Sequence, residues 1–479
     1  MNAVRDEEKR AMDNSVFNRL WLIDSKGIYH IEDIDDVPDI IASLIKEEFQ
    51  EKYLHDNRIL SEIESIMNEL GYEWDSLAEV GYPRFKPYAV TINEVLGKRI
   101  WRKVKLFGEN SNIPIYRIEG GELYSLNNND IKNHTILAEE VGMYGRTIYR
   151  VNAIDNQILR FSACCNKLGI AQGFDIKRDN LPFGLFEISK SYRYEEENRL
   201  RIGERCRCFR LPELHILNDS IPSALSLIIE ANEVIKGELY NLQYQYVVLC
   251  SVTSRFFKNN IGFIQKIACT NKYPMLIYLV PDDNEMCENG VQFDIEYKAL
   301  TSYGGFLEIA TLQLDDGSTG FSYGIKYNDI GDGNYYPVCT IHAVFSASIE
   351  RSAYVVAERA AFNKKKNHHY YIPFELAPIQ CRILLDKDAN YRDIENRLIQ
   401  LKVRYDIDDR NINIEEKLSA TDLKYIPYIV FLQGRKRFYD TLNDKNMAEN
   451  EFWNIIEKEC WRGDVSSYVP ILLSQRFDI

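Results

Sequence analysis

The chain has 479 residues, of which 45% are hydrophobic and 27% are charged, and its formal net charge at pH 7 is -14. This length and composition predict a globular protein with two or three domains, each large enough to bury its own core. The acidic balance argues against a surface that binds nucleic acid indiscriminately, although it leaves room for a local basic track.

Neither the start of the chain nor its apolar runs indicate secretion or a membrane. The first residues, MNAVRDEEKR, lack the pattern of a secretory signal, and no apolar run approaches the roughly 20 residues of a membrane helix. The ten cysteines are irregularly spaced, which favours reduced thiols over a disulfide framework. We therefore expect a cytoplasmic protein that has no membrane partner.

Three segments with different sequence patterns follow one another along the chain. The first covers residues 1–85, which carry no catalytic motif. Within this segment WLIDSKGIYHIED predicts a hairpin, and PDIIASLIKEEFQEKYL predicts an amphipathic helix. We interpret the segment as a small N-terminal extension.

Residues 86–372 mix strand-like and helical patterns, which predicts an antiparallel sheet with helices packed on it. SIPSALSLIIEANEVIKGEL is the clearest helical stretch. The predicted strands are NIPIYRIEG, TIYRV, FGLFEISKSYRYE and FLEIATLQLD.

Residues 373–479 then alternate between strand and helix, a pattern typical of a small α/β domain. Its predicted elements are QCRILLD, NYRDIENRLIQLK, VRYDIDD, NIEEKLSATDLK and IPYIVFL.

Candidate phosphate-binding residues begin in Ser191–Phe209, which has the form of two strands joined by a charged loop. The guanidinium of Arg193 could grip an α-phosphate while charge builds at phosphorus. Glu195 is expected on the same face of the same strand, where it could accept hydrogen bonds from an adenine amine or an amino group. Arg205 could reach the outer phosphates from the return strand. Taken alone, an Arg-x-Glu pair is more often a surface salt bridge.

A second phosphate-binding candidate is Arg351, at the point where SASIERSAYVVAE is predicted to run from a strand into a helix. Together, the hairpin and this junction resemble motifs 2 and 3 of class II aminoacyl-tRNA synthetases. The resemblance implies an α+β fold, with a class II antiparallel-sheet catalytic domain at 86–372 and an α/β anticodon-binding domain at 373–479.

LRFSACC, LPELHIL and PVCTIHAVFSASIER resemble the zinc-ligand segments of threonyl-tRNA synthetases, particularly the archaeal type. The resemblance implies that Cys164, His215 and His342 bind zinc and leave a fourth position open, as catalytic zinc sites do. It further implies that Glu213 receives the ammonium proton or holds the amine of threonine, and that Gln313 lies near the aminoacyl pocket. Taken singly, a core cysteine or a core histidine would be the better explanation of each ligand position, and a plain strand glutamine would explain Gln313 nearly as well.

The activity implied by the resemblance is ATP-dependent ligation of L-threonine to tRNA(Thr) through a threonyl-adenylate, by a homodimer that uses Zn²⁺, and Mg²⁺ with ATP. Serine lacks only one methyl group, so we expect serine to be activated as well. We find no segment that resembles an editing domain and expect correction by a separate trans-editing protein. The alternatives are a paralogue that loads threonine or a related amino acid onto an acceptor other than tRNA, and a non-catalytic sensor.

Three positions depart from the family pattern. Gly121 stands where a motif 1 proline is expected, Ala347 where motif 3 has a glycine, and Glu204 where the motif 2 loop usually has a basic residue. The basic clusters at 97–105, 364–366 and 434–438 could contact phosphates or be solvated surface.

Overall fold

The computed structural model of the protein describes residues 16–50, 56–128, 148–151, 156–241, 245–281, 290–329, 331, 333–363, 370–386, 389–419 and 424–460. They form two compact units, each built from separate stretches of the chain. The first unit comprises Met1–Asp56, Ile100–Glu196 and Arg207–Ile349, and the second comprises Asn57–Arg99, Glu197–Cys206 and Glu350–Ile479. The functional division at residues 85 and 372 remains a prediction.

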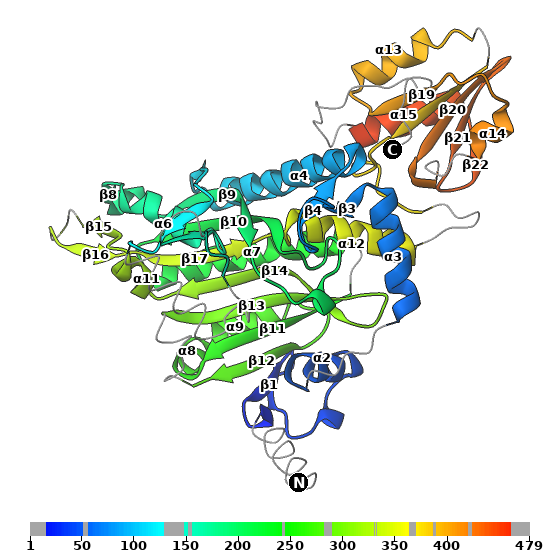
Figure 1. Cartoon of the computed structure of the whole chain (residues 1–479). Helices are drawn as coiled ribbons and strands as arrows, with labels where there is room; N and C mark the ends of the chain where they lie inside the picture. The colour runs from blue at the N-terminus through cyan, green and yellow to red at the C-terminus, as the bar shows by residue number, and fades with distance from the viewer. Residues whose placement is uncertain are drawn as a thin grey trace. The chain divides into compact units, whose positions relative to one another are not determined.

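A ten-stranded sheet forms the centre of the first unit (Figure 1). In spatial order its strands are β2 (Ile28–His30), β1 (Leu20–Ile23), β12 (Met275–Val280), β11 (Tyr246–Thr253), β13 (Val291–Leu300), β14 (Phe306–Asp315), β17 (Cys339–Val344), β10 (Cys208–Asn218), β9 (Phe183–Tyr192) and β5 (Ile115–Arg117). Neighbouring strands are antiparallel except for the pairs β11–β12 and β5–β9. The predicted antiparallel sheet is therefore confirmed.

The N-terminal hairpin is also confirmed, and it extends this sheet at one edge. The helix predicted next to it is confirmed over Asp39–Gln50, and residues 51–55 lie outside the described part of the chain. β1 pairs with β2 and, on its other side, with β12. The helix α2 (Asp39–Gln50) buries Ile41, Leu44 and Ile45, whose spacing places them on one helical face. These side chains share a core with residues of β1, β11 and β12.

Helices cover one face of the sheet, and side chains alternate along β13 between this face and the other. The covering helices are α7 (Ile221–Asn241), α8 (Ser254–Asn259) and α9 (Ile261–Ala268). The ring of Phe293 packs against aromatic rings of α8 and α9, and the hydroxyl of Tyr297 donates a hydrogen bond to α7. Because successive strand residues point to opposite faces, Asp294 and Glu296 lie on the other face. That face carries polar residues.

Smaller elements complete the first unit. They are α6 (Cys164–Gln172), α11 (Ser318–Ser322), the pair β6 (Leu123–Ser125) and β7 (Gln157–Leu159), and a sheet of β16 (Tyr335–Pro337), β15 (Lys326–Asn328) and β8 (Ile176–Lys177). The strand predicted for TIYRV is wrong for residues 148–151, because they make only one isolated bridge, between Arg150 and Ile158. Thr147 lies outside the described residues.

The second unit contains the predicted α/β arrangement, in which β18 is parallel to both of its neighbours. Its five-stranded sheet has the order β19 (Tyr405–Asp408), β18 (Cys381–Leu385), β20 (Tyr428–Gln433), β21 (Arg435–Asp440) and β22 (Lys445–Met447). The helices are α3 (Asn57–Glu69), α12 (Ile349–Phe362), α13 (Arg392–Gln400), α14 (Ile414–Leu418) and α15 (Glu449–Cys460). A hairpin of β3 (Tyr72–Trp74) and β4 (Pro83–Phe85) precedes α4 (Pro87–Ser111), whose residues divide between the two units.

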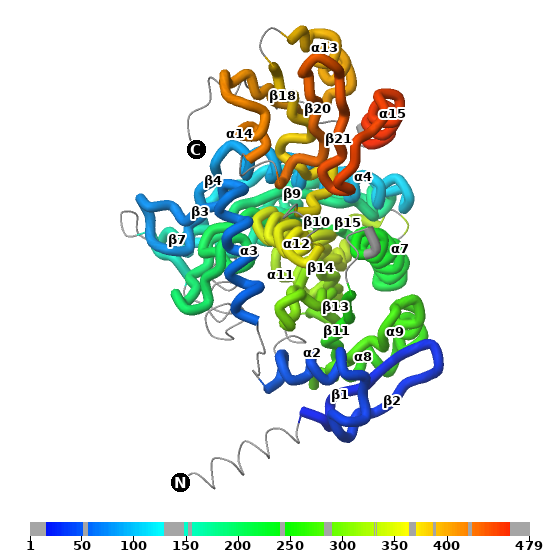
Figure 2. Tube along the Cα trace, turned by 90° about the vertical axis from the view of Figure 1, so that its right-hand side faces the viewer, coloured from blue at the N-terminus to red at the C-terminus, as the bar shows by residue number. Residues whose placement is uncertain are grey.

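The core of this α/β arrangement lies between the sheet and the helices α13 and α15, which Figure 2 shows beside the strands. Leu398 of α13 and Phe452 of α15 are fully buried against Val430 at the centre of β20. The helix predicted over residues 413–424 is shorter than expected, because α14 ends at Leu418. Residues 420–423 lie outside the described part of the chain.

The eight cysteines whose side chains are described are all free thiols. Among the described helices, none combines the length and the apolar character needed to cross a bilayer.

Candidate metal centre

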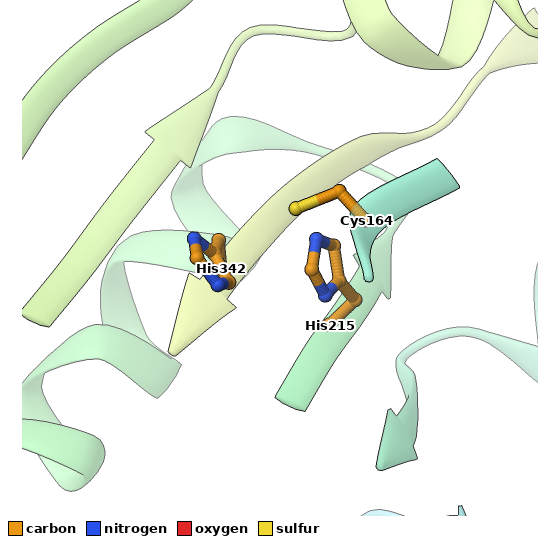
Figure 3. A group of neighbouring side chains, drawn as sticks. All are labelled: Cys164, His215 and His342. Carbon is orange, nitrogen blue, oxygen red and sulfur yellow. The ribbon is translucent and has the colours of Figure 1, made fainter. Parts of the chain in front are cut away.

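Three residues from distant parts of the sequence meet on the polar face of the large sheet. Cys164 is the first residue of α6, His215 lies on β10 and His342 lies on β17. One potential ligand atom from each of them lies within 4.8 Å of the others. Figure 3 shows the Cys164 side chain reaching toward the two imidazole rings. The structure thus brings the three predicted ligands together.

Strand register explains the position of the two histidines. His215 and His342 are directly opposite each other in the antiparallel pair β10–β17. Opposed residues point to the same face of a sheet, and the ring centroids here are 4.7 Å apart with an interplanar angle of 28°. The N-terminus of α6 then brings Cys164 to the same face.

The protonation of these imidazoles suits a cation. Nδ1 of His215 and Nε2 of His342 are buried and have no hydrogen-bond partner. Buried polar atoms normally have partners, so these two nitrogens indicate a place for a ligand. Burial lowers the pKa of His215 well below its usual range, and the positive charge of Lys167 lowers it further. His215 is therefore neutral, which is the form that binds metals.

Cys164 supplies the third donor. Burial raises the pKa of its thiol to about 12, and the charge of Glu213 acts in the same direction. Binding of a metal would therefore release the thiol proton. One sulfur and two imidazole nitrogens form a donor set that zinc prefers, with bonds of about 2.0–2.3 Å, and three protein ligands leave a fourth position for another molecule. The residues present fit a catalytic zinc ion.

A chain of hydrogen bonds through Gln313 and Asp294 orients the His342 ring at its Nδ1 side. Oε1 of Gln313 lies 3.0 Å from Nδ1 of His342, and Nε2 of Gln313 donates to Oδ2 of Asp294 at 2.8 Å. Thr311 donates to the other oxygen of Asp294 at 2.7 Å. Because the Gln313 oxygen only accepts hydrogen bonds, this network assigns the proton of His342 to Nδ1 and leaves the lone pair of Nε2 for a metal. Gln313 was predicted near the pocket, whereas Asp294 was missed.

Glu213 also lies at the centre, as predicted. It is two residues before His215 on β10, so both side chains point to the same face. Its Oε1 lies 3.5 Å from Nε2 of His342, and its Oε2 accepts a hydrogen bond from Nζ of Lys167 at 2.9 Å. Burial by itself would raise the pKa of Glu213, but the charge of Lys167 and the contact with His342 hold it well below its usual range.

A second carboxylate lies beside this pair. Glu187 on β9 is directly opposite Glu213 on β10. Nη1 of Arg160 donates to Oε1 of Glu187 at 3.1 Å, and Nζ of Lys167 lies 4.0 Å from its Oε2. Two cations thus balance two facing carboxylates. Sequence reasoning missed Lys167, although its position three residues after Cys164 on a helix places both residues on one helical face.

The predicted positions of Arg193 and Glu195 need correction, because neither lies on a strand. β9 ends at Tyr192, where the chain leaves the ladder for a short 3₁₀ turn at Glu197–Arg199. The backbone N–H of Arg193 still donates to the carbonyl of Arg207, and its Nε donates to the carbonyl of Phe161 at 2.9 Å. Glu195 is buried, and its carbonyl accepts two hydrogen bonds from the Arg207 guanidinium.

Arg205 and Arg351 belong to the second unit. Arg205 is not on the return strand as predicted, because β10 begins at Cys208, and its backbone instead exchanges two hydrogen bonds with Arg201. Arg351 is the third residue of α12, so the predicted helix at this junction is confirmed. Nε of Arg351 donates to the carbonyl of Glu204 at 3.1 Å, which links this helix to the loop that carries Arg205.

The structure describes the surroundings of two departures from the family pattern, Gly121 and Ala347. A Cβ atom at Gly121 would meet no atom within 4 Å, so the local structure does not require glycine there. A Cβ at the neighbouring Gly120 would lie 2.2 Å from Nδ2 of Asn166, so that position does require glycine. Ala347 is buried.

Sequence comparison identifies relatives along most of the chain. A threonine–tRNA ligase from Staphylothermus marinus is 30% identical over 434 residues, which cover 87% of this chain and 67% of that protein. A threonine–tRNA ligase from Pyrobaculum calidifontis is 28% identical over 421 residues, which cover 86% of this chain and 67% of that protein. The chain spans about two thirds of the length of these relatives. No protein-family model matches it.

Solved structures share the fold. A crystal structure described as the RNA-binding domain of threonyl-tRNA synthetase from Cryptosporidium parvum superposes with a TM-score of 0.66 and 14% identity, covering 83% of this chain and 98% of that one. A prolyl-tRNA synthetase from the same organism superposes with a TM-score of 0.59 and 14% identity, covering 84% of this chain and 78% of that one. These neighbours establish the class II synthetase fold for the chain.

Proposed function

Because the chain belongs to the threonine–tRNA ligase family of aminoacyl-tRNA synthetases, we propose that it ligates L-threonine to tRNA(Thr) with ATP, through a threonyl-adenylate. We further propose that Cys164, His215 and His342 hold a zinc ion that selects the amino acid. The observation that carries this proposal is the meeting of these three side chains, with Nδ1 of His215 and Nε2 of His342 buried and without a hydrogen-bond partner.

In this proposal the pocket distinguishes amino acids by whether they carry both an amine and a side-chain hydroxyl that can bind zinc. With three protein ligands, a bound zinc ion could take the amine and the side-chain hydroxyl of threonine as its fourth and fifth ligands. Valine has the shape of threonine but lacks the hydroxyl, so it would supply one zinc ligand fewer. An apolar pocket without the metal would separate the two amino acids only about 100-fold. Glu213 lies beside His342 and is the group of this chain that would accept a proton from the threonine amine or hold that amine.

Serine is the competitor that this chemistry does not exclude. It carries the same amine and hydroxyl as threonine, and the missing methyl group is worth only roughly 1–3 kcal/mol. We therefore propose that the enzyme also activates serine and that a separate hydrolase removes serine from tRNA(Thr). The purified chain should then deacylate seryl-tRNA(Thr) more slowly than it makes it.

Activation of threonine requires charge neutralisation at the phosphates. In our proposal Arg193 grips the α-phosphate, Arg351 and Arg205 meet the outer phosphates together with Mg²⁺, and Glu195 accepts hydrogen bonds from adenine. Fixed guanidinium groups stabilise the charge that develops during transfer at phosphorus. The chain contributes mainly positioning and electrostatic stabilisation.

The remaining parts of the proposal concern partners and location. Residues 373–479 would read the anticodon, whose unpaired bases can stack on aromatic side chains. We propose a homodimer, as the family resemblance implies. The free cysteines of the described residues support a reducing compartment, so we propose that the enzyme acts in the cytoplasm.

One pair of assays tests the function. Threonine-dependent exchange of pyrophosphate into ATP reports adenylate formation, and charging of transcribed tRNA(Thr) reports transfer. Both activities are expected, together with bound zinc. Exchange without charging would indicate an acceptor other than tRNA, and the absence of exchange would indicate a non-catalytic sensor.

A further inference from the structure

Lys167 is fully buried at the base of the candidate metal centre, and the proposed function gives it no role. Buried ammonium groups are rare and need close partners. Nζ of Lys167 donates to Oε2 of Glu213 at 2.9 Å and to the carbonyl of Ala163 at 3.4 Å, and it lies 4.0 Å from Glu187. Its strongest partner is therefore the carboxylate nearest to the metal ligands.

Glu213 is placed where it could itself become a ligand. Its Oε1 lies 3.5 Å from Nε2 of His342. Bonds of about 2.0–2.2 Å in a tetrahedral zinc site put ligand atoms roughly 3.3–3.6 Å apart, and carboxylate oxygens are ordinary zinc ligands. A fourth protein ligand would close the site, because four-coordinate structural sites have no open position.

The other nearby cation cannot substitute for Lys167. Arg160 is bound to Glu187 through Nη1 at 3.1 Å, and the same nitrogen donates to the carbonyl of Gly121 at 3.0 Å. Its Nε donates to the carbonyl of Lys190 at 2.7 Å. Lys167 is thus the cation that holds Glu213.

We propose that Lys167 is a positioning residue that holds the Glu213 carboxylate outside the coordination shell of the metal and so keeps the fourth position open for the amino acid. This inference rests on the zinc-dependent selection proposed above. Without Lys167, the nearest positive charge for the Glu213 carboxylate is the metal ion itself, and Oε1 completes the coordination.

Cobalt substitution tests this arrangement, because Co²⁺ has visible absorption bands that report its ligands. Apoprotein loaded with Co²⁺ should change its spectrum when L-threonine is added. Lys167→Met should still bind Co²⁺, at least as tightly, but its spectrum should not respond to threonine, and its affinity for threonine should fall 10-fold or more. Lys190→Met, a change of an exposed lysine on β9, is the matched control and should behave as the unmodified protein does.

A double variant separates coordination from simple damage. In Lys167→Met combined with Glu213→Gln, the amide is a poor ligand, so the Co²⁺ spectrum without threonine, which differs from that of the unmodified protein in Lys167→Met, should return to it. Removing both members of a buried ion pair is also less destabilising than removing one. The inference is overturned if Lys167→Met responds to threonine normally, or if it folds but loses Co²⁺.

Glu213→Gln alone supplies a test that does not depend on the folding of Lys167→Met. Its Co²⁺ spectrum without threonine should equal that of the unmodified protein, because Glu213 is not a ligand while Lys167 is present. A different spectrum would refute the inference. Failure of the unmodified protein to bind Co²⁺, or to respond to threonine, would instead refute the proposed zinc-dependent selection.

Discussion

Gln313 and His342 are directly opposite each other on β14 and β17, and Oε1 of Gln313 lies 3.0 Å from Nδ1 of His342. The contact determines which imidazole nitrogen carries the proton, and Asp294 holds the glutamine amide from the next strand. Groups that orient a metal ligand in this way contribute strongly to metal affinity.

Replacing Gln313 with Leu should therefore lower zinc affinity about 10- to 100-fold, because His342 loses the acceptor that sets its tautomer. Competition with a chelator measures the change. Thr311→Val is the comparison, since it removes one hydrogen bond to Asp294 and leaves the hydrogen bond between Gln313 and His342 in place. Equal zinc affinity in Gln313→Leu and the unmodified protein would contradict the orienting role.

His342→Ala should abolish zinc binding and threonine activation while the protein still folds, because it removes one of three ligands. Elemental analysis, circular dichroism and pyrophosphate exchange measure the three properties. His30→Ala changes an exposed histidine on β2 and should keep both zinc and activity. Threonine activation by a zinc-free His342→Ala protein would refute zinc-dependent selection.

Arg351→Ala should slow pyrophosphate exchange about 100-fold or more without changing metal content, because it removes a fixed charge from the phosphates. Arg359→Ala, on the same helix, is a suitable control, since that guanidinium lies over the ring of Phe362. A variant of Arg351 that exchanges pyrophosphate at the normal rate would remove this residue from the mechanism.

Arg435 and Lys436 are exposed at the start of β21, within the predicted anticodon-binding domain. Replacing each with Ala should weaken tRNA binding and make the plot of log K against log salt concentration shallower, by roughly 0.7–0.9 for each phosphate that the side chain neutralises. Pyrophosphate exchange should be unchanged. Lys26→Ala, in the turn between β1 and β2, provides the control. If Arg435→Ala and Lys436→Ala both keep the tRNA affinity and the salt slope of the Lys26→Ala control, β21 does not bind tRNA.

Arg382 and Asp406 form a fully buried ion pair between β18 and β19, with hydrogen bonds of 2.8 and 2.7 Å. Arg382→Met alone leaves Asp406 without its partner and should destabilise the second unit by about 3–5 kcal/mol. Changing both residues, as Arg382→Met with Asp406→Leu, should recover most of this loss. Denaturant unfolding measures both. The exposed Arg392, which pairs with Glu395, supplies the control, and Arg392→Met should leave the unfolding midpoint unchanged.

The element types were largely predictable, because each depends on a local pattern. The spacing of Ile41, Leu44 and Ile45 indicates a helix, and the predicted strand FLEIATLQLD is present as β14. Boundaries were less predictable. Arg193 and Glu195 were predicted on a strand that ends at Tyr192, because hydrogen-bond pairing rather than composition decides where a ladder stops.

By itself the sequence determined the fold class and the identity of Cys164, His215 and His342 as candidate ligands, because family motifs and hydrophobic periodicity are properties of short stretches. Only the tertiary structure decided that Lys167 holds Glu213 and that Asp294 holds Gln313 behind His342. These interactions depend on strand register and on where α6 lies against the sheet. Both are set by the packing of segments far apart in the chain, which no local pattern records.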